Sequence, residues 1–201
     1  MEFLRELAVV VLYLLALINP VSKISVIAAS SWAGQPAEFR AIINKSSAVA
    51  LAILFGTMLF GQFVFTQVFR VELHSLNVAG GIVVAWFGFN ALRQGVFFEK
   101  AIEQRLSDMA IVPLACPLIA GPATIAASLT MTAAGDLRMP ALAVLVALAV
   151  NHVIMLFSLP IAALLRGLNV LGALVRLTGL VVMTIGVQMV LNGLRAARAG
   201  L

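Results

Sequence analysis

The fold is decided by one apolar stretch in the middle of the chain, Leu114-Ala115-Cys116-Pro117-Leu118-Ile119-Ala120-Gly121-Pro122-Ala123-Thr124. It lies in a run without charged residues from Met109 to Gly135, which is long enough to cross a bilayer. Proline removes a backbone donor and clashes with the preceding helical turn, so we expect no continuous helix here. Backbone groups left free in lipid are costly unless protein or a wet cavity satisfies them. The break therefore predicts a binding site, with a packing kink as the structural alternative.

The composition is typical of an integral membrane protein. Of the 201 residues, 63% are hydrophobic and 10% are charged, and the mean hydropathy is +1.12. Soluble domains are nearer half apolar and a quarter charged. The net charge is +5, but the basic residues lie mostly between apolar runs, where they orient membrane helices, so we expect no nucleic-acid partner. The single cysteine, Cys116, excludes an internal disulfide and a cysteine-based metal site, and we expect no metal and no cofactor.

Six apolar segments predict an all-α polytopic membrane protein with six transmembrane helices. The polar connection around Gln35 to Lys45 separates the first two, and Asp136 with Pro140 predicts a cap and first turn for the fifth. The expected spans are Leu7–Ser31 (interrupted at Asn19-Pro20), Ser46–Phe69, Ser75–Leu92, Met109–Ala134, Pro140–Leu165 and Leu177–Leu194.

Positive charge gives a weak indication of orientation. Seven of the 13 basic residues lie on one side of the predicted spans and five on the side that holds both termini, while Lys23 lies within a span. Because cytoplasmic loops carry the excess of Lys and Arg, both termini are expected outside the cytoplasm.

The two halves of the chain resemble each other. Gly81 to Asn90 parallels Gly179 to Gln188, with glycines at the same spacing and a carboxamide at the same place. The first and fourth spans both break at an X-Pro step that is followed two residues later by a hydroxyl, in Ser22 and Thr124. The predicted domains are a first three-helix repeat (1–98), a connecting loop (99–108) and a second, inverted repeat (109–201). Helices broken at matching places near the midplane are typical of transporter sites.

These residues resemble the MarC family of bacterial and archaeal inner-membrane proteins, which includes the SnatA small neutral amino-acid transporters. The similarity is carried by Ile111 to Ile125, Asn19-Pro20, Gly80-Gly81-Ile82 and Gly186 to Gly193, and so covers essentially the whole chain. The resemblance implies six spans, location in the inner membrane, and movement of glycine, alanine and similar amino acids.

The chain departs from the family pattern beside both breaks. Ser22, Lys23 and Ser25 stand where the family usually has Gly, Asn and Pro, and Ala123 stands where it usually has Gly. These differences bear on the identity of the substrate more than on the fold.

The first break predicts half of a substrate site. A half-helix that begins at Pro20 and is capped by Asn19 would leave the N–H groups of Val21, Ser22 and Lys23 pointing into the break. Such a terminus carries partial positive charge and binds carboxylates.

The second break predicts the other half of the site. Pro122 would expose the N–H groups of Ala123 and Thr124, facing those of the first break. Carbonyl groups that end the preceding half-helices, around Leu17, Ile18, Ile119 and Ala120, would accept hydrogen bonds from an ammonium group. The small residues at Ala120, Gly121 and Ala123 favour a small zwitterionic substrate over a larger one.

Four polar residues within the spans have two interpretations each. Lys23 would pair with the substrate carboxylate, or it would snorkel or bond backbone carbonyls. His152 would carry protons, or it would be a hydrogen-bonded packing residue, which is the commoner case. Asn90 and Gln188 would line the path or join helices, with joining favoured.

The leading hypothesis is a secondary carrier of small neutral amino acids that works by alternating access in the lipid bilayer. The alternatives are a channel or facilitator for small polar solutes and a membrane protein without transport activity. An enzyme is not expected, because the spans show no Ser/His/Asp constellation, paired carboxylates or metal-ligand spacing. Small residues such as Gly56 to Gly61 suit either a homo-oligomer contact or internal packing.

Overall fold

The computed structural model describes residues 1–95, 114–132, 137–168 and 170–199, and all regular structure in these ranges is helical. The expectation of an all-α chain is confirmed. The elements, in chain order, are α1 (Glu2–Ile18), α2 (Pro20–Ala29), η1 (Ser31–Gly34), α3 (Pro36–Phe63), η2 (Val64–Val68), α4 (Leu73–Gln94), η3 (Leu114–Ile119), α7 (Pro122–Thr132), α8 (Arg138–Leu156), α9 (Ser158–Gly167) and α10 (Leu171–Ala199).

Five segments of the described residues are long and apolar enough to cross a membrane. Their outward faces carry large exposed apolar side chains such as Phe60, Trp86 and Leu177, which suit contact with lipid rather than water. The five segments are Glu2–Ala28, Pro36–Val68, Leu73–Gln94, Arg138–Leu156 and Leu171–Ala199.

The first apolar segment contains a break at Asn19. α1 ends at Ile18, and Asn19 adopts a left-handed backbone conformation with φ 53°, which Asn tolerates better than most residues. Pro20 then occupies the first position of α2, where its missing N–H removes no helical hydrogen bond. The first apolar segment therefore consists of two helices that are separated at the Asn-Pro step. The position of this break near the bilayer midplane stays a prediction.

The fourth predicted span is seen only in part. Residues 109–113 and 133–134 of that span, the connecting loop 99–108 and Asp136 lie outside the described residues. Within the described part, Cys116 is extended (φ −139°, ψ 122°), as expected for a residue that precedes proline. α7 begins afresh at Pro122, directly after Gly121.

Two predicted boundaries are wrong. α3 begins at Pro36 rather than at Ser46, because proline and an acidic residue, Glu38, in the first turn favour a helix start there. The predicted span Pro140–Leu165 is two helices that meet at Phe157. The ring of Pro160 would clash with the carbonyl of Leu156 in a continuous helix, which explains this break.

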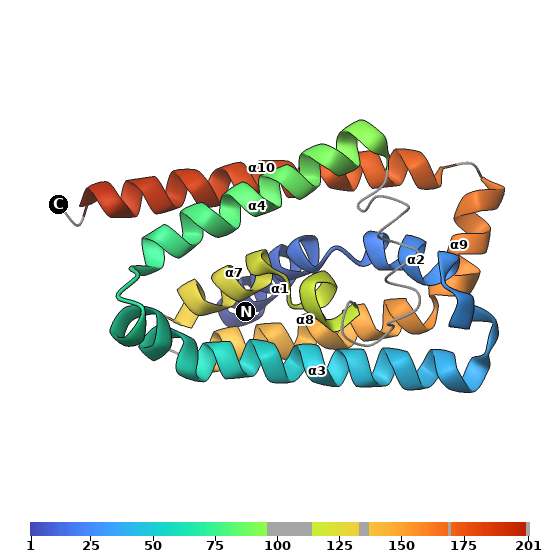
Figure 1. Ribbon diagram of the computed structural model, residues 1–201, viewed down its shortest axis with the longest axis horizontal. Coiled ribbons are helices and arrows are strands. Elements are labelled where there is room, and N and C mark those ends of the chain that lie inside the picture. The colour runs from blue at the N-terminus through green and yellow to red at the C-terminus, as the bar shows by residue number, and fades with distance from the viewer. Residues whose placement is uncertain (96–113, 133–136, 169, 200–201) are drawn as a thin grey trace.

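α4 and α10 form an antiparallel pair whose backbones approach closely (Figure 1). A Cβ on Gly88 would lie 2.6 Å from the carbonyl oxygen of Gly179, and a Cβ on Gly179 would lie 3.0 Å from that of Gly88. Gly81 and Gly186 face each other in the same way, two helical turns from the contact of Gly88 with Gly179. Small residues permit such close helix approach within a membrane. The sequence-matched glycines are therefore the contact surface of this pair.

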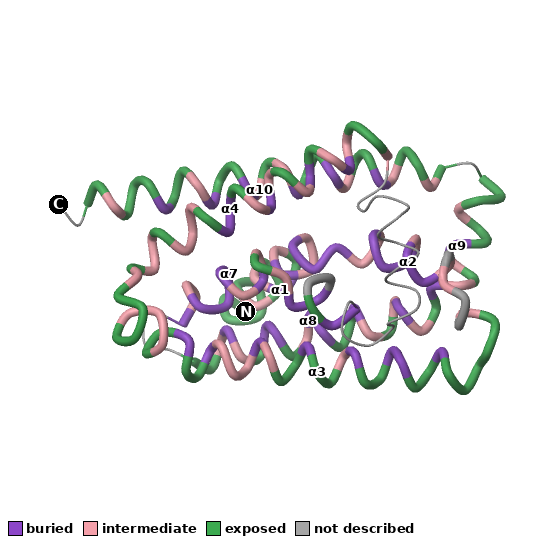
Figure 2. The backbone as a smooth tube through the Cα atoms, viewed as in Figure 1, coloured by how far each residue is buried: buried purple, intermediate pink, exposed green. Residues whose placement is uncertain are grey.

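The remaining helices enclose α2 and α7. α2 contacts α8 and α9, and α7 contacts α1, α3 and α4. Figure 2 shows that buried residues concentrate on these inner helices, while the long α3 and α10 expose much of their surface. The candidate site residues at the starts of α2 and α7 are thus buried or half-buried, except for Pro122, which is exposed.

Candidate functional site

The start of α2 is capped by its own side chains. Asn19 Oδ1 accepts a hydrogen bond from the backbone N–H of Ser22 at 3.4 Å, and Ser22 Oγ donates to the Asn19 carbonyl at 2.7 Å. Both side chains are buried, while Pro20 and Val21 are half-buried. The expectation that the Ser22 N–H is free is therefore wrong, because the Asn cap satisfies it.

Lys23 is a basic residue enclosed in the interior of the bundle. Its side chain is fully buried, at 0% exposure. Its Nζ donates one long hydrogen bond, of 3.4 Å, to the Asn19 carbonyl, and no carboxylate of the described residues pairs with it. An ammonium group has three donors and is costly to bury without an anion. Because Lys23 is buried and bonds the Asn19 carbonyl, it does not snorkel to the interface, and the interpretation in which it bonds backbone carbonyls is the one that matches. Its pairing with a substrate carboxylate stays a prediction.

The start of α7 is closed by Thr124. Its buried hydroxyl donates to the carbonyl of Ile119 at 3.0 Å and to that of Gly121 at 2.9 Å. The expectation that the Ile119 carbonyl is a free acceptor is therefore wrong. Ala120 is buried, Gly121 and Ala123 are half-buried and Pro122 is exposed.

The helices next to the two breaks pack against each other. α7 contacts α1, which leads directly into the Asn19 break. A direct meeting of the N-termini of α2 and α7 stays a prediction.

Two buried polar atoms on α8 and α9 have no hydrogen-bond partner among the described residues. They are Oδ1 of Asn151, which is 1% exposed, and Oγ of Ser158, which is 0% exposed. Both belong to the helices on which α2 packs. Buried polar groups are nearly always paired, so unpaired ones indicate a place for a polar ligand or water. Sequence reasoning missed Ser158, although a serine two residues before Pro160 was a visible signal.

His152 is paired with a residue of another helix. Its Nδ1 lies 2.8 Å from Oγ of Ser47, in a half-buried hydrogen bond that joins α8 to α3. This contact matches the interpretation of His152 as a hydrogen-bonded packing residue, and its lining of a transport path stays a prediction.

The other polar span residues are less enclosed. Gln188 Nε2 donates to Asn192 Oδ1 at 2.8 Å, but both residues are exposed and lie on α10, so this bond joins no helices. Asn90 is half-buried. Cys116 is exposed, at the point where the chain is extended before Pro117.

A small cavity with both polar and apolar lining residues lies between α1, α4, α7 and α10. Its volume is about 120 Å³, enough for several waters or one small solute. The Thr130 hydroxyl donates to Asn77 Oδ1 at 2.9 Å in its wall. The lining residues are Tyr13, Asn77, Ala127, Thr130, Met131, Met189 and Asn192. Within the described part of the chain, no three side chains of His, Cys, Asp or Glu gather as a metal ion requires.

Comparison with known proteins identifies the family. The model of the MarC family of integral membrane proteins matches residues 4–198. The chain is 31% identical to a UPF0056 membrane protein of Pyrococcus horikoshii over 192 residues, 94% of each chain. It is 27% identical to a UPF0056 membrane protein of Bacillus subtilis over 193 residues, 90% of each. It is 29% identical to the UPF0056 inner membrane protein MarC of Citrobacter koseri over 212 residues, 96% of each. No solved structure matches the chain. Because the family match extends over nearly all residues, the chain belongs to the MarC family of integral membrane proteins.

Proposed function

We propose that this chain is a secondary transporter of small neutral amino acids and not an enzyme. The observation that carries the proposal is the fully buried ammonium group of Lys23, which has no carboxylate partner among the described residues. A substrate carboxylate would supply the missing anion, and intramembrane ionisable residues generally belong to substrate paths. The N-terminus of α2, one turn away, adds partial positive charge in the same place.

The remainder of the substrate would be held by neutral polar groups. Asn151 Oδ1 is a buried acceptor without a partner among the described residues, suited to the substrate ammonium group. The Ser158 hydroxyl can donate to the substrate or accept from it. Ala120 and Ala123 beside the second break leave space for a small side chain and offer it no charge. The proposed substrates are therefore glycine, alanine and serine.

Alternating access would arise from two inverted three-helix repeats with breaks at Asn19-Pro20 and Gly121-Pro122. The glycine contacts of α4 and α10 support a pseudo-two-fold relation. The contact of Gly81 with Gly186 and the contact of Gly179 with Gly88 are the same contact with the roles of the two helices exchanged. The small cavity lined by Asn77 and Thr130 lies between helices of both proposed repeats, where transporter sites are usually found. The C. koseri relative is named an inner membrane protein, which supports that location for this chain. Both termini would lie outside the cytoplasm.

Exchange in proteoliposomes tests the proposal. Purified protein is reconstituted into vesicles loaded with unlabelled alanine, and uptake of labelled glycine, alanine and serine is followed. We expect saturable exchange that is lost in Lys23→Met and retained in Lys45→Met, because Lys45 is exposed on α3. Gly121→Leu, at the second break, is expected to lose exchange as well.

Two results would overturn the proposal. Flux that neither saturates nor shows counterflow would indicate a channel. Folded protein that exchanges none of these amino acids would remove the substrate assignment and leave only the membership of the family.

A further inference from the structure

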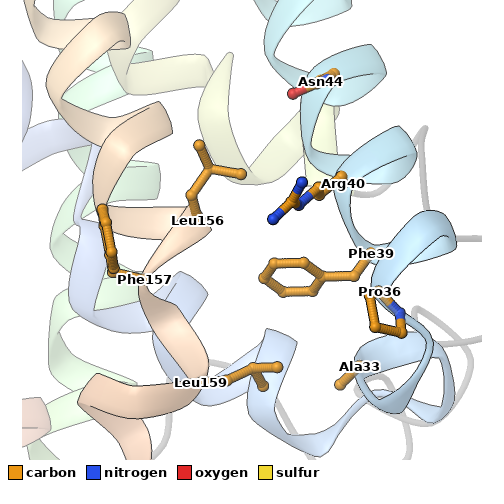
Figure 3. A pocket seen from close by; sticks show the side chains of 8 residues that line it. All are labelled: Ala33, Pro36, Phe39, Arg40, Asn44, Leu156, Phe157 and Leu159. Atoms are coloured by element: carbon orange, nitrogen blue, oxygen red, sulfur yellow. The ribbon is translucent and has the colours of Figure 1, made fainter.

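A second, larger cavity opens between the start of α3 and the junction of α8 with α9. Its volume is about 520 Å³. Figure 3 shows Arg40 and Phe39 pointing from α3 toward Leu156 across the cavity. The lining residues are Ala33, Pro36, Phe39, Arg40, Asn44, Leu156, Phe157 and Leu159, so Arg40 is the single charged member of an otherwise mostly apolar wall.

Arg40 lacks an acidic partner within the described residues. It is exposed, and Asn44 follows it by one helical turn on the same face of α3. A guanidinium group and a carboxamide at this spacing offer several donors to one anion. Arginine in particular binds phosphate with two parallel hydrogen bonds.

The length of α3 indicates where the cavity lies across the bilayer. The apolar segment Pro36–Val68 has 33 residues, which at about 1.5 Å per residue is longer than the roughly 30 Å hydrocarbon core. The first turns of α3, with Arg40 and Asn44, therefore reach the headgroup layer.

An apolar track leaves the cavity along α8. Phe157 lines the cavity and is 58% exposed, and Val153 and Val150 follow it at helical spacing with 51% and 37% exposure. Phe157 follows the last residue of α8, and Val153 and Val150 lie on the same side of that helix, so the three side chains form a line from the cavity toward the middle of α8. A chain of methylene groups can lie along them while its polar head stays at Arg40.

We propose that this cavity binds an anionic glycerophospholipid, with the phosphate on Arg40 and Asn44 and an acyl chain along Phe157, Val153 and Val150. Basic pockets between membrane helices at the headgroup level recognise such lipids. The combination of one unpaired cation with an apolar track favours an amphiphile over a free anion. This inference does not depend on the transport proposal.

Lipid binding to the purified full-length chain in detergent tests the inference. Delipidated protein is titrated with phosphatidylglycerol and with phosphatidylcholine, and bound lipid is counted by native mass spectrometry. We expect a preference for phosphatidylglycerol and about tenfold weaker binding of it in Arg40→Gln, because a charge-assisted hydrogen bond is lost. Arg166→Gln is the matched control, since Arg166 is exposed in the last turn of α9 and does not line the cavity.

A second variant tests the apolar part of the cavity. Leu156→Trp keeps Arg40 and fills the space opposite it, and we expect it to weaken phosphatidylglycerol binding as well. If Arg40→Gln and Arg166→Gln weaken phosphatidylglycerol binding equally, the lipid is attracted by unspecific positive charge, and the inference is overturned. Equal binding of the two lipids, or displacement of phosphatidylglycerol by inorganic phosphate alone, would overturn it too.

Discussion

Gly81 and Gly186 pack backbone against backbone. A Cβ on Gly81 would lie 2.6 Å from the carbonyl oxygen of Gly186, and a Cβ on Gly186 would lie 2.7 Å from that of Gly81. The obstacle on each side is backbone, which cannot move aside as a flexible side chain can. The contact is reciprocal because α4 and α10 run antiparallel with glycines at the same spacing.

Gly81→Ala is expected to destabilise the protein. The added methyl group forces α4 and α10 apart, and overpacking of this kind costs about 1–3 kcal/mol. Thermal unfolding in detergent measures the change. Gly56→Ala is the control, because a Cβ there meets no atom within 4 Å and the helix gains propensity. Equal melting temperatures for the two variants would contradict the close approach.

Local chain chemistry was sufficient to predict the breaks at the two X-Pro steps. Asn19 and Pro20 fix a cap and a first helical position, and Cys116 is extended because proline follows it. The glycines that recur at the same spacing in the third and sixth predicted spans are the ones that meet in the contact of α4 with α10. Phe157 was missed because the proline responsible for that break, Pro160, lies inside the following helix rather than beside the break.

The partners of polar groups could not be predicted from the sequence. Whether the Ile119 carbonyl is free depends on the rotamer of Thr124, and His152 bonds Ser47 only because α8 packs on α3. The periodicity of apolar residues in the sequence carries no information about such contacts, whether they are local or join distant helices. The complete burial of Lys23 also depends on how α2 docks on α8 and α9.

Thr124→Val is expected to loosen the break between η3 and α7. Valine matches threonine in shape but removes the hydroxyl that bonds the carbonyls of Ile119 and Gly121, at an expected cost of about 1–2 kcal/mol. Thr124→Ser keeps the hydroxyl and is the control. The free energies of unfolding in detergent should rank wild type, then Ser, then Val. A valine variant as stable as the serine variant would show that the two hydrogen bonds do not stabilise the break.

Ser47 and His152 are expected to be coupled energetically. A double-mutant cycle with Ser47→Ala and His152→Leu isolates their hydrogen bond, for which we expect about 0.5–1.5 kcal/mol. The control cycle combines Ser47→Ala with Thr178→Ala, because the Thr178 hydroxyl bonds within α10 and the two effects should add. A coupling energy of zero between Ser47 and His152 would indicate that the bond contributes nothing to the packing of α3 on α8.

Ser158→Ala is expected to separate substrate binding from stability. The Ser158 hydroxyl is fully buried without a partner among the described residues, so its removal abolishes an unpaired polar group. In the absence of amino acid, we expect the variant to melt at the same temperature as the wild type or higher, since an unsatisfied buried group costs about 1–3 kcal/mol. If the hydroxyl binds substrate, the KM for exchange should rise about tenfold, because a hydrogen bond to a charged group is then lost.

Ser128→Ala is the matched control for this change. Ser128 is also fully buried, but its hydroxyl donates to the carbonyl of Ile125 at 3.0 Å. Its removal should lower stability by about 0.5–1.5 kcal/mol and leave the KM unchanged. If Ser158→Ala lowers the stability and leaves the KM unchanged, the Ser158 hydroxyl stabilises the fold and does not bind the substrate. That result would confine the substrate to the surroundings of Lys23 and the N-terminus of α2.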